Sequence, residues 1–163
     1  MIVLVMGVSG SGKNAIGEPL AARLGWKFID GDDYHPPENV KKMAAGIPLQ
    51  DEDRWPWLDR LNALLRKEKQ AVLACSALKK AYRRRLLDGI PDHAIVHLRG
   101  SFELIRSRVE ARRHRYMPAS LLQSQFDTLE PPREAIDVDV SHDVDASVSA
   151  IIEKLSPRLT DRS

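Results

Sequence analysis

A glycine-rich stretch near the start of the chain has a spacing that binds phosphate groups. Gly7 is followed by four residues, and then by Gly12 and Lys13. Glycine lets the backbone come close to a phosphate, the N–H groups of such a loop point at the phosphate oxygens, and the lysine adds a full positive charge. The pattern predicts a loop for the triphosphate of ATP, formed by Gly7, Val8, Ser9, Gly10, Ser11, Gly12, Lys13 and Asn14.

Asn14 departs from this pattern. The place after the lysine normally holds Ser or Thr, whose hydroxyl binds Mg²⁺. An amide oxygen can also bind a hard cation, but the asparagine side chain is longer and its NH₂ end would repel the ion. We therefore expect Asn14 to serve as a weaker Mg²⁺ ligand, and a serine at this place to improve metal use.

Acidic residues follow the second apolar run of the chain. Asp30, Asp32 and Asp33 come directly after residues 26–29, which we predict to be a strand. Ligands of open α/β sheets bind at the carboxyl ends of strands. Asp30 is the candidate to orient the attacking hydroxyl or accept its proton, or to hold Mg²⁺ through water. Asp32 and Asp33 suit the hydroxyls of a sugar-like acceptor, although an Asp-rich turn that only faces water is an alternative.

Two further side chains are candidates for the acceptor side. His35 is either a substrate contact or an ordinary loop residue, and the sequence leaves both open. Arg54 follows Asp51, Glu52 and Asp53. It therefore either pairs with these acids or presents a two-pronged donor to a substrate carboxylate.

Basic residues gather in the middle of the chain. Residues 79–115 hold eleven Lys/Arg and four Asp/Glu, although the whole chain has a net charge of only +2. This excess suits nucleic acid or a small anion such as ATP, and the phosphate loop favours ATP. We predict a lid at about residues 108–118 that covers ATP and excludes water. Arg108 and Arg112 lie one helical turn apart; we expect Arg108 to bind ATP and Arg112 to be catalytic.

Five apolar runs that are typical of strands alternate with helical patterns. The strands are expected at residues 2–6, 26–29, 70–75, 94–98 and 135–140. The alternation predicts an α/β fold, a five-stranded parallel sheet with helices on both faces. The length suits one domain over residues 1–163, with a substrate-binding helical part at about residues 36–70. We expect the long helix of that part to begin after Arg54, and the last helix to cover residues 146–155 with Asp145 as its cap.

Composition narrows the setting in which the protein works. Cys75 is the single cysteine, so a disulfide framework cannot form and a reducing cytoplasm is expected. No apolar run has the length of a membrane span, and Met1 leads directly into the first strand without a secretory signal. We expect neither a membrane nor a nucleic-acid partner.

Several motifs together resemble the gluconokinase family. They are the phosphate loop, the Asp-Gly-Asp-Asp-Tyr-His-Pro run at 30–36, Gly-Ile-Pro-Leu at 46–49, Asp-Glu-Asp-Arg at 51–54, residues 75–80 and residues 123–131. The resemblance implies a P-loop kinase fold of the nucleoside-monophosphate-kinase type, a homodimer, and use of ATP and Mg²⁺ to phosphorylate the terminal hydroxyl of D-gluconate. It also implies that residues 30–35, Arg54 and Gln125 line the gluconate side.

Two departures from the family pattern keep alternatives open. Asn14 replaces the usual Ser or Thr, and Arg115 stands where the family has a histidine, so the role of that histidine does not carry over. One alternative is a kinase for shikimate or a nucleoside monophosphate on the same fold. Another is a nucleotide-binding module whose catalysis is weakened by Asn14. The polar cluster at residues 32–35 favours an acceptor with several hydroxyls over a nucleobase.

Overall fold

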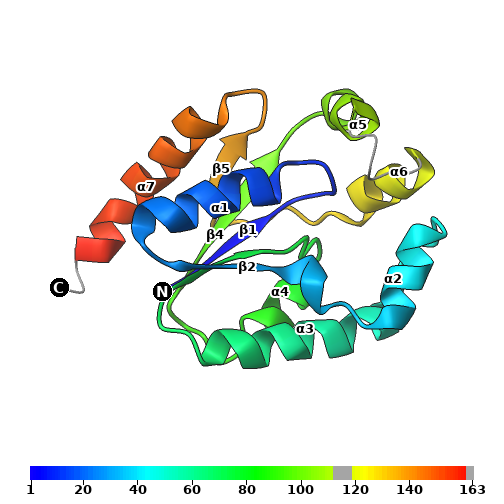
Figure 1. Ribbon diagram of the computed structural model, residues 1–163, viewed down its shortest axis with the longest axis horizontal. Coiled ribbons are helices and arrows are strands. Elements are labelled where there is room, and N and C mark those ends of the chain that lie inside the picture. Colours follow the sequence, from blue (N-terminus) through cyan, green and yellow to red (C-terminus); the bar gives the residue numbers. More distant parts are fainter. Residues whose placement is uncertain (112–118, 161–163) are drawn as a thin grey trace.

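A single parallel sheet forms the centre of the protein (Figure 1). The computed structural model describes residues 1–111 and 119–160. The sheet has the strand order β2-β3-β1-β4-β5, and all neighbouring strands are parallel, which confirms the predicted fold class. Its strands are β1 (Ile2–Met6), β2 (Lys27–Asp30), β3 (Ala71–Ala74), β4 (His93–Arg99) and β5 (Ile136–Asp139).

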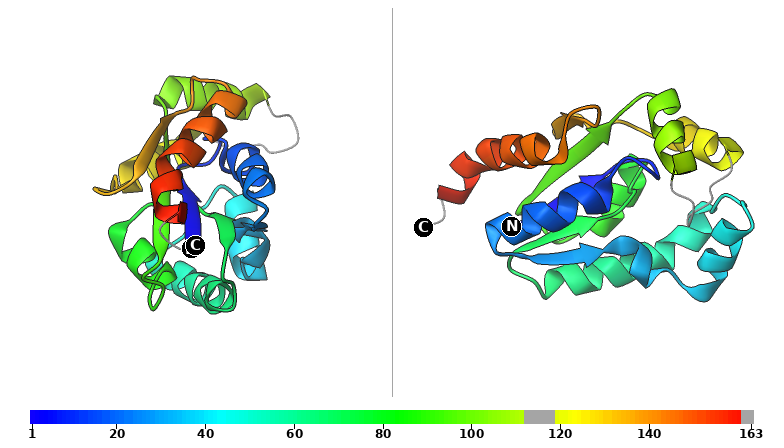
Figure 2. Two further views of the ribbon diagram at one scale, coloured as in Figure 1. Left: turned by 90° about the vertical axis from the view of Figure 1, so that its left-hand side faces the viewer. Right: turned by 45° about the horizontal axis from the view of Figure 1, so that its top comes forward.

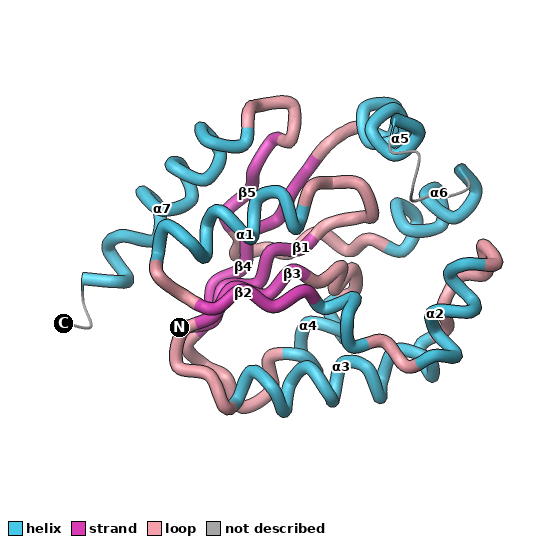
Figure 3. Tube along the Cα trace, in the orientation of Figure 1, coloured by secondary structure: helices cyan, strands magenta, loops and turns pink. Residues whose placement is uncertain are grey.

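Helices cover both faces of this sheet (Figures 2 and 3). One face carries α1 and α7, the other carries α3 and α4, and α5 and α6 lie beyond the carboxyl ends of the strands. A short 3₁₀ turn (Gly31–Tyr34) follows β2. The helices are α1 (Lys13–Leu24), α2 (Pro37–Ala44), α3 (Asp51–Arg66), α4 (Lys80–Leu86), α5 (Phe102–Ala111), α6 (Ala119–Thr128) and α7 (Val144–Thr160).

The central strand β1 divides the apolar interior into two cores. Val3 and Val5 point into the core that contains Ile16 of α1 and Ile151 of α7. The alternate residues of β1 point into the second core, with Leu58, Leu61 and Leu65 of α3. All five residues of β1 are buried, because a strand in the middle of a parallel sheet has helices on both sides. The phosphate loop therefore grows out of the best-protected strand of the fold.

The helical part at 36–70 contains α2 and α3, and α3 begins earlier than expected. We expected a connection up to Arg54, but α3 starts at Asp51 because Gln50 and Asp53 form a capping box. Lys42 of α2 donates to both carboxylate oxygens of Asp53, at 2.9 and 2.8 Å. This ion pair ties α2 to the first turn of α3, so that the two helices form one unit beside the end of β2.

The last helix is longer than the sequence indicated. It begins at Val144 rather than Ala146, and the carboxylate that accepts from the backbone N–H of Ala146 belongs to Asp143, at 2.8 Å, and not to Asp145. It continues through Pro157 to Thr160, and Arg158 donates to the carbonyl of His93 at 2.7 Å. Within residues 1–111 and 119–160, no helix is both long and apolar enough to cross a membrane.

Candidate active site

The phosphate loop joins β1 to α1, as the sequence predicted. Gly12 precedes α1 in a left-handed conformation, with φ of 97°. Gly10 also has a positive φ, of 80°, and a Cβ there would collide with Val109 of α5. Both places therefore require glycine. The ammonium group of Lys13 lies over the loop and donates to the carbonyls of Gly7 and Val8, each at 3.1 Å.

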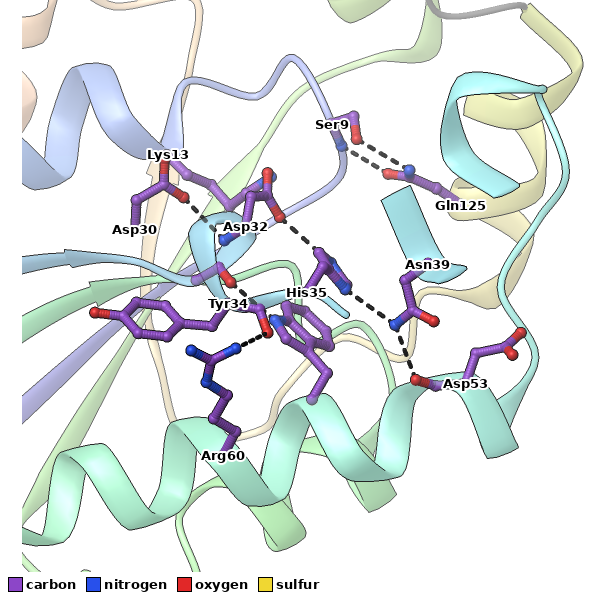
Figure 4. A network of polar contacts seen from close by, with 12 residues as sticks. Ser9, Lys13, Asp30, Asp32, Tyr34, His35, Asn39, Asp53, Arg60 and Gln125 are labelled. Carbon is purple, nitrogen blue, oxygen red and sulfur yellow. Dashed lines mark hydrogen bonds and ion pairs between the residues drawn. The ribbon is translucent and has the colours of Figure 1, made fainter. Parts of the chain in front are cut away.

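The loop is also held from outside, by Gln125 of α6 (Figure 4). The backbone N–H of Ser9 donates to Oε1 of Gln125 at 2.7 Å, and Nε2 of Gln125 donates to the Ser9 hydroxyl at 2.9 Å. The resemblance assigned Gln125 to the gluconate side. The structure places its amide against the tip of the phosphate loop, and a contact with substrate stays a prediction.

Asp30 lies where the phosphate loop helix and the acceptor side meet. It ends β2, and its carboxylate accepts from Nδ2 of Asn14 at 2.8 Å and from the backbone N–H of Asp32 at 3.0 Å. A carboxylate without a proton only accepts hydrogen bonds, so the NH₂ end of Asn14 must face Asp30. The amide oxygen of Asn14 is thereby left for another partner, and the NH₂ group is not directed at a bound cation.

The oxygens of Asp30 and Asn14 fit a Mg²⁺ ion held jointly with phosphates. Mg²⁺ keeps several waters and usually takes only one or two protein ligands in kinase sites. Among the described residues, no cluster of three or more His, Cys, Asp or Glu side chains could hold a metal by itself. A site completed by the nucleotide, with Asn14 and Asp30 as the protein ligands, is therefore the arrangement that suits these residues.

His35 is buried in the acceptor side. It is 9% exposed and stacks on Trp57, with ring centroids 3.9 Å apart and an angle of 17° between the rings. Burial lowers the pKa of His35, and the charge of Arg54 lowers it further, whereas Asp32 raises it. Asp32 and Asp33 are both exposed, and Nε2 of His35 lies 3.7 Å from the Asp32 carboxylate. The buried His35 ring and the exposed Asp32 carboxylate thus face one another.

Arg54 does not pair with the acids that precede it. Its Nη1 donates to the carbonyl of Leu49 at 2.6 Å and to the Tyr82 hydroxyl at 3.0 Å. Two of these acids have other partners, since Asp53 binds Lys42 and Asp51 accepts from Tyr82. Among the described residues, Nε and Nη2 of Arg54 make no hydrogen bond or ion pair, and the guanidinium lies over the Tyr82 ring, 4.9 Å from its centroid. These donors remain for a carboxylate, and the charge of Arg54 lowers the pKa of His35.

A hollow on the other side of the phosphate loop could take the nucleoside half of ATP. It has a volume of about 410 Å³ and lies between Gly10–Gly12, Arg108 and the segment 138–147. Arg108 donates to the carbonyl of Val140, and the Ser11 hydroxyl is buried with no partner among the described residues. The sequence interpretation found Arg108 but missed residues 140–147. Their place after the last strand, at the same sheet edge as the loop, was the available signal.

The predicted catalytic residue Arg112 and most of the predicted lid lie outside the described residues. Arg112 and residues 112–118 of the expected lid are outside the described residues; of this segment only Arg108–Ala111, the end of α5, is described. Larger hollows beside α4, of up to about 870 Å³, contain none of the candidate residues.

Comparison with the sequences of known proteins identifies the family. A family model described as shikimate kinase matches residues 9–159. A protein of Xenopus tropicalis named as a probable gluconokinase is 46% identical, over 95% of this chain and 91% of that protein. The chain belongs to the gluconokinase family. The thermosensitive gluconokinase of Escherichia coli K12 is 47% identical over 86% of this chain and 80% of its own.

The gluconokinase family also provides a close structural match. The crystal structure of a gluconokinase from Sinorhizobium meliloti 1021 superposes with a TM-score of 0.89 and 43% identity, covering 99% of this chain and 96% of that chain. The resemblance inferred from the motifs is confirmed. It also disfavours the shikimate and nucleotide-module alternatives, because these relatives with 43–47% identity over most of their length are gluconokinases.

Proposed function

We propose that the protein transfers the γ-phosphate of ATP to the terminal hydroxyl of D-gluconate, giving 6-phospho-D-gluconate and ADP. The observation that carries this proposal is the bond between Asn14 of the phosphate loop helix and Asp30 at the end of β2. It brings the site for ATP and the acidic cluster of the acceptor side to one edge of the sheet. Membership of the gluconokinase family supports gluconate as the acceptor.

Each side chain then has a defined task. Lys13 and the loop N–H groups hold the β- and γ-phosphates. Asp30 takes the proton of the gluconate hydroxyl. At the same time the hydroxyl oxygen bonds to the γ-phosphorus, and the bond between that phosphorus and the β–γ bridging oxygen breaks. Such a positioned acid–base group contributes about 10²–10⁴-fold in rate. Asp32, Asp33 and His35 contact the hydroxyls.

The charges on both substrates also have matching groups. The free donors of Arg54 suit the gluconate carboxylate. Asn14 and Asp30 would hold Mg²⁺ together with the phosphates, and the ion would neutralise charge on the transferring group. The proposal also includes Arg108 as a nucleotide contact, Arg112 as a catalytic residue and residues 108–118 as a lid.

The proposal extends to the cellular compartment of the enzyme, its oligomeric state and its partners. Cys75 is buried and free, and burial raises the pKa of its thiol to about 12, so the thiol is unreactive and suits the reducing cytoplasm. The resemblance to the family supports a homodimer. Neither nucleic acid nor a membrane has a place in this function.

An acceptor screen tests the proposal. ADP release is measured with D-gluconate, other sugar acids, neutral sugars, shikimate and nucleoside monophosphates, with Mg²⁺ and ATP present, and ³¹P NMR identifies the product. We expect D-gluconate to give the highest kcat/KM and a phosphate monoester at its terminal carbon. Lys13→Ala serves as the inactive control.

Three results would contradict the assignment. A higher kcat/KM with shikimate or a nucleotide would indicate another acceptor. ADP release that does not depend on any acceptor would indicate an ATPase. ATP binding without turnover on any acceptor would indicate a nucleotide-binding module.

A further inference from the structure

We infer that Asn39 holds His35 as a neutral imidazole with its proton on Nε2, so that His35 and Asp32 together recognise one hydroxyl of the acceptor. Asn39 is a buried residue of α2, only 2% exposed, and it has no contact of its own with the open site. It therefore acts as a positioning residue for His35. The inference rests on the proposed function only for the identity of the acceptor.

The orientation of the Asn39 amide follows from one backbone contact (Figure 4). The side chain lies 2.9 Å from the carbonyl oxygen of Asp53, in the first turn of α3. A carbonyl oxygen carries no hydrogen, so the atom that faces it must be the NH₂ nitrogen of Asn39. The same nitrogen lies 3.1 Å from Nδ1 of His35. Its two hydrogens thus serve these two acceptors, one each.

This contact decides where the imidazole carries its proton. Because Asn39 presents a hydrogen to Nδ1, that ring nitrogen must offer a lone pair. In a neutral imidazole the proton then sits on Nε2. A second proton would have to enter Nδ1 against the NH₂ group of Asn39. The tautomer follows from the position of Asn39 and from the Asp53 carbonyl.

Packing keeps the ring from turning over. Trp57 stacks on His35 at 3.9 Å, and its own Nε1 donates to the carbonyl of Gly31 at 2.8 Å. A half-turn of the imidazole would bring a carbon atom to the Asn39 amide and leave that buried NH₂ with an unused hydrogen, which is costly. The stacking and the amide together fix both the plane of the ring and the direction of its Nε2–H.

The charges around the ring agree with the neutral form. Asp30 and Asp32, before and within the 3₁₀ turn, favour a proton on His35, whereas Arg54 of α3 and burial disfavour it. Burial is the largest of these influences, and it lowers the pKa of His35. On the α2 side, Lys42 is paired with Asp53 behind the Asn39 amide.

The Nε2–H of His35 and the carboxylate of Asp32 then form a pair with opposite hydrogen-bonding roles. The two atoms are 3.7 Å apart, which is too far for a hydrogen bond. A single oxygen atom can lie about 2.8 Å from both of them and form a hydrogen bond with each. A hydroxyl can accept from Nε2–H and donate to Asp32 at once, whereas a keto oxygen can only accept. At one carbon of the acceptor, the pair therefore favours a hydroxyl over a carbonyl and over a carbon that bears no oxygen.

The first test reads the tautomer directly in the wild-type protein. In ¹⁵N-labelled protein, the nitrogen shifts and one-bond N–H couplings of His35 distinguish a protonated from an unprotonated ring nitrogen. We expect the protonated nitrogen to be Nε2 between pH 6 and pH 8. A protonated Nδ1 would overturn the inference whatever the acceptor is, so this result does not depend on the proposed function.

The second test exchanges the donor on Asn39 for an acceptor. Asn39→Asp puts a carboxylate oxygen beside Nδ1, which should draw a proton onto that nitrogen and raise the KM for gluconate about two- to tenfold, with the KM for ATP unchanged. Asn62→Asp is the matched control, because the NH₂ group of Asn62 also serves two acceptors, but these are the backbone carbonyls of Leu86 and Asp88, beside α4. An unchanged KM for gluconate in folded Asn39→Asp would contradict the inference.

A panel of monodeoxygluconates tests the recognition of one hydroxyl even if Asn39→Asp fails to fold. The wild-type enzyme should lose kcat/KM most strongly with the analogue that lacks one particular hydroxyl, and His35→Ala should abolish that preference while it keeps the others. Equal sensitivity of the wild type and His35→Ala to every analogue would refute the paired contact. If no analogue and no gluconate were phosphorylated, the proposed function would fail while the ¹⁵N result would still stand.

Discussion

Replacing Asp30 with asparagine separates the chemical task of its carboxylate from its structural one. In Asp30→Asn, the remaining oxygen can still accept from the backbone N–H of Asp32, which lies at 3.0 Å in the wild type. The new NH₂ group then faces the NH₂ group of Asn14, where the wild type has a hydrogen bond of 2.8 Å. Two donors cannot bond, so Asn14 either loses this contact or turns its amide round.

The size of both effects follows from these contacts. A hydrogen bond to a charged group contributes about 1.5–3 kcal/mol, and we take about 1–2 kcal/mol here because both side chains are only half-buried. For a chain of this length, that lowers the Tm by about 2–8 °C. Loss of the group that takes the hydroxyl proton lowers kcat by about 10²–10⁴-fold, while the Kd for ATP changes little.

A charge-exchange variant separates the two effects. In Asn14→Asp combined with Asp30→Asn, an asparagine at 30 donates to a carboxylate at 14, so the hydrogen bond returns with its direction reversed. We expect the Tm to recover in the double variant and kcat to stay low, because the carboxylate now lies in the phosphate loop helix. Tm is measured by thermal unfolding, kcat by coupled ADP release and the Kd for ATP by calorimetry.

The exposed neighbour Asp33 provides the control. Asp33→Asn removes the same charge from the same turn, and we expect it to alter the KM for gluconate at most, with kcat and Tm unchanged. Two results would refute the reasoning: Asp30→Asn with wild-type turnover, or recovery of kcat together with Tm in the double variant. The second result would mean that Asp30 serves only to hold Asn14.

Two further predictions concern the phosphate loop. Asn14→Ser should lower the Mg²⁺ concentration needed for half-maximal activity and raise turnover, since a hydroxyl is the usual ligand there; Mg²⁺ titrations of both proteins check this, and identical curves would make Asn14 a fully competent ligand. Gln125→Ala should raise the KM for ATP and leave the KM for gluconate unchanged, because it frees Ser9 at the tip of the loop. Gln123→Ala is its control, since Gln123 lies on the same helix and, among the described residues, its side chain bonds only to Asp127. A raised KM for gluconate with an unchanged KM for ATP in Gln125→Ala would place Gln125 on the gluconate side.

The sequence predicted those features of the fold and the site that a local pattern of residues determines. Apolar runs alternating with helical patterns were enough for the five-stranded parallel sheet, because its central strands β1 and β3 are buried on both faces. The spacing of Gly7, Gly12 and Lys13 located the phosphate loop, because the geometry of phosphate binding demands it. The acidic turn after β2 was found for a similar reason, since strand ends of parallel sheets gather at one edge.

Contacts between distant segments were beyond such patterns. Gln125 meets Ser9 across 116 positions of the chain, and no periodicity marks that pair. Asn39 looked like an unremarkable polar residue of a helix, yet it is 2% exposed because three elements converge on it. The start of α3 was misplaced because Gln50 and Asp53 satisfy its first N–H groups only when they are read together as a cap.

The place of β1 in the sheet sets the order in which the protein can fold during its synthesis. β1 is made before the other four strands of the sheet, but it pairs with β3 and β4 and not with β2. Its earliest partner residue, Ala71, comes 65 positions after Met6, which corresponds to about 3–13 s of translation. For that time a short, uncharged apolar strand has no neighbour to pair with, the kind of segment that is prone to aggregate.

The second neighbour of β1 begins only at His93. Until β4 has left the ribosome, β1 lies at the edge of an incomplete sheet, and the loop that follows it lacks the scaffold on which its glycines take their conformation. We therefore expect nascent chains that end before His93 to bind chaperones and to bind no ATP. The phosphate loop is synthesised before the two strands that flank β1, and it can take its shape only after them.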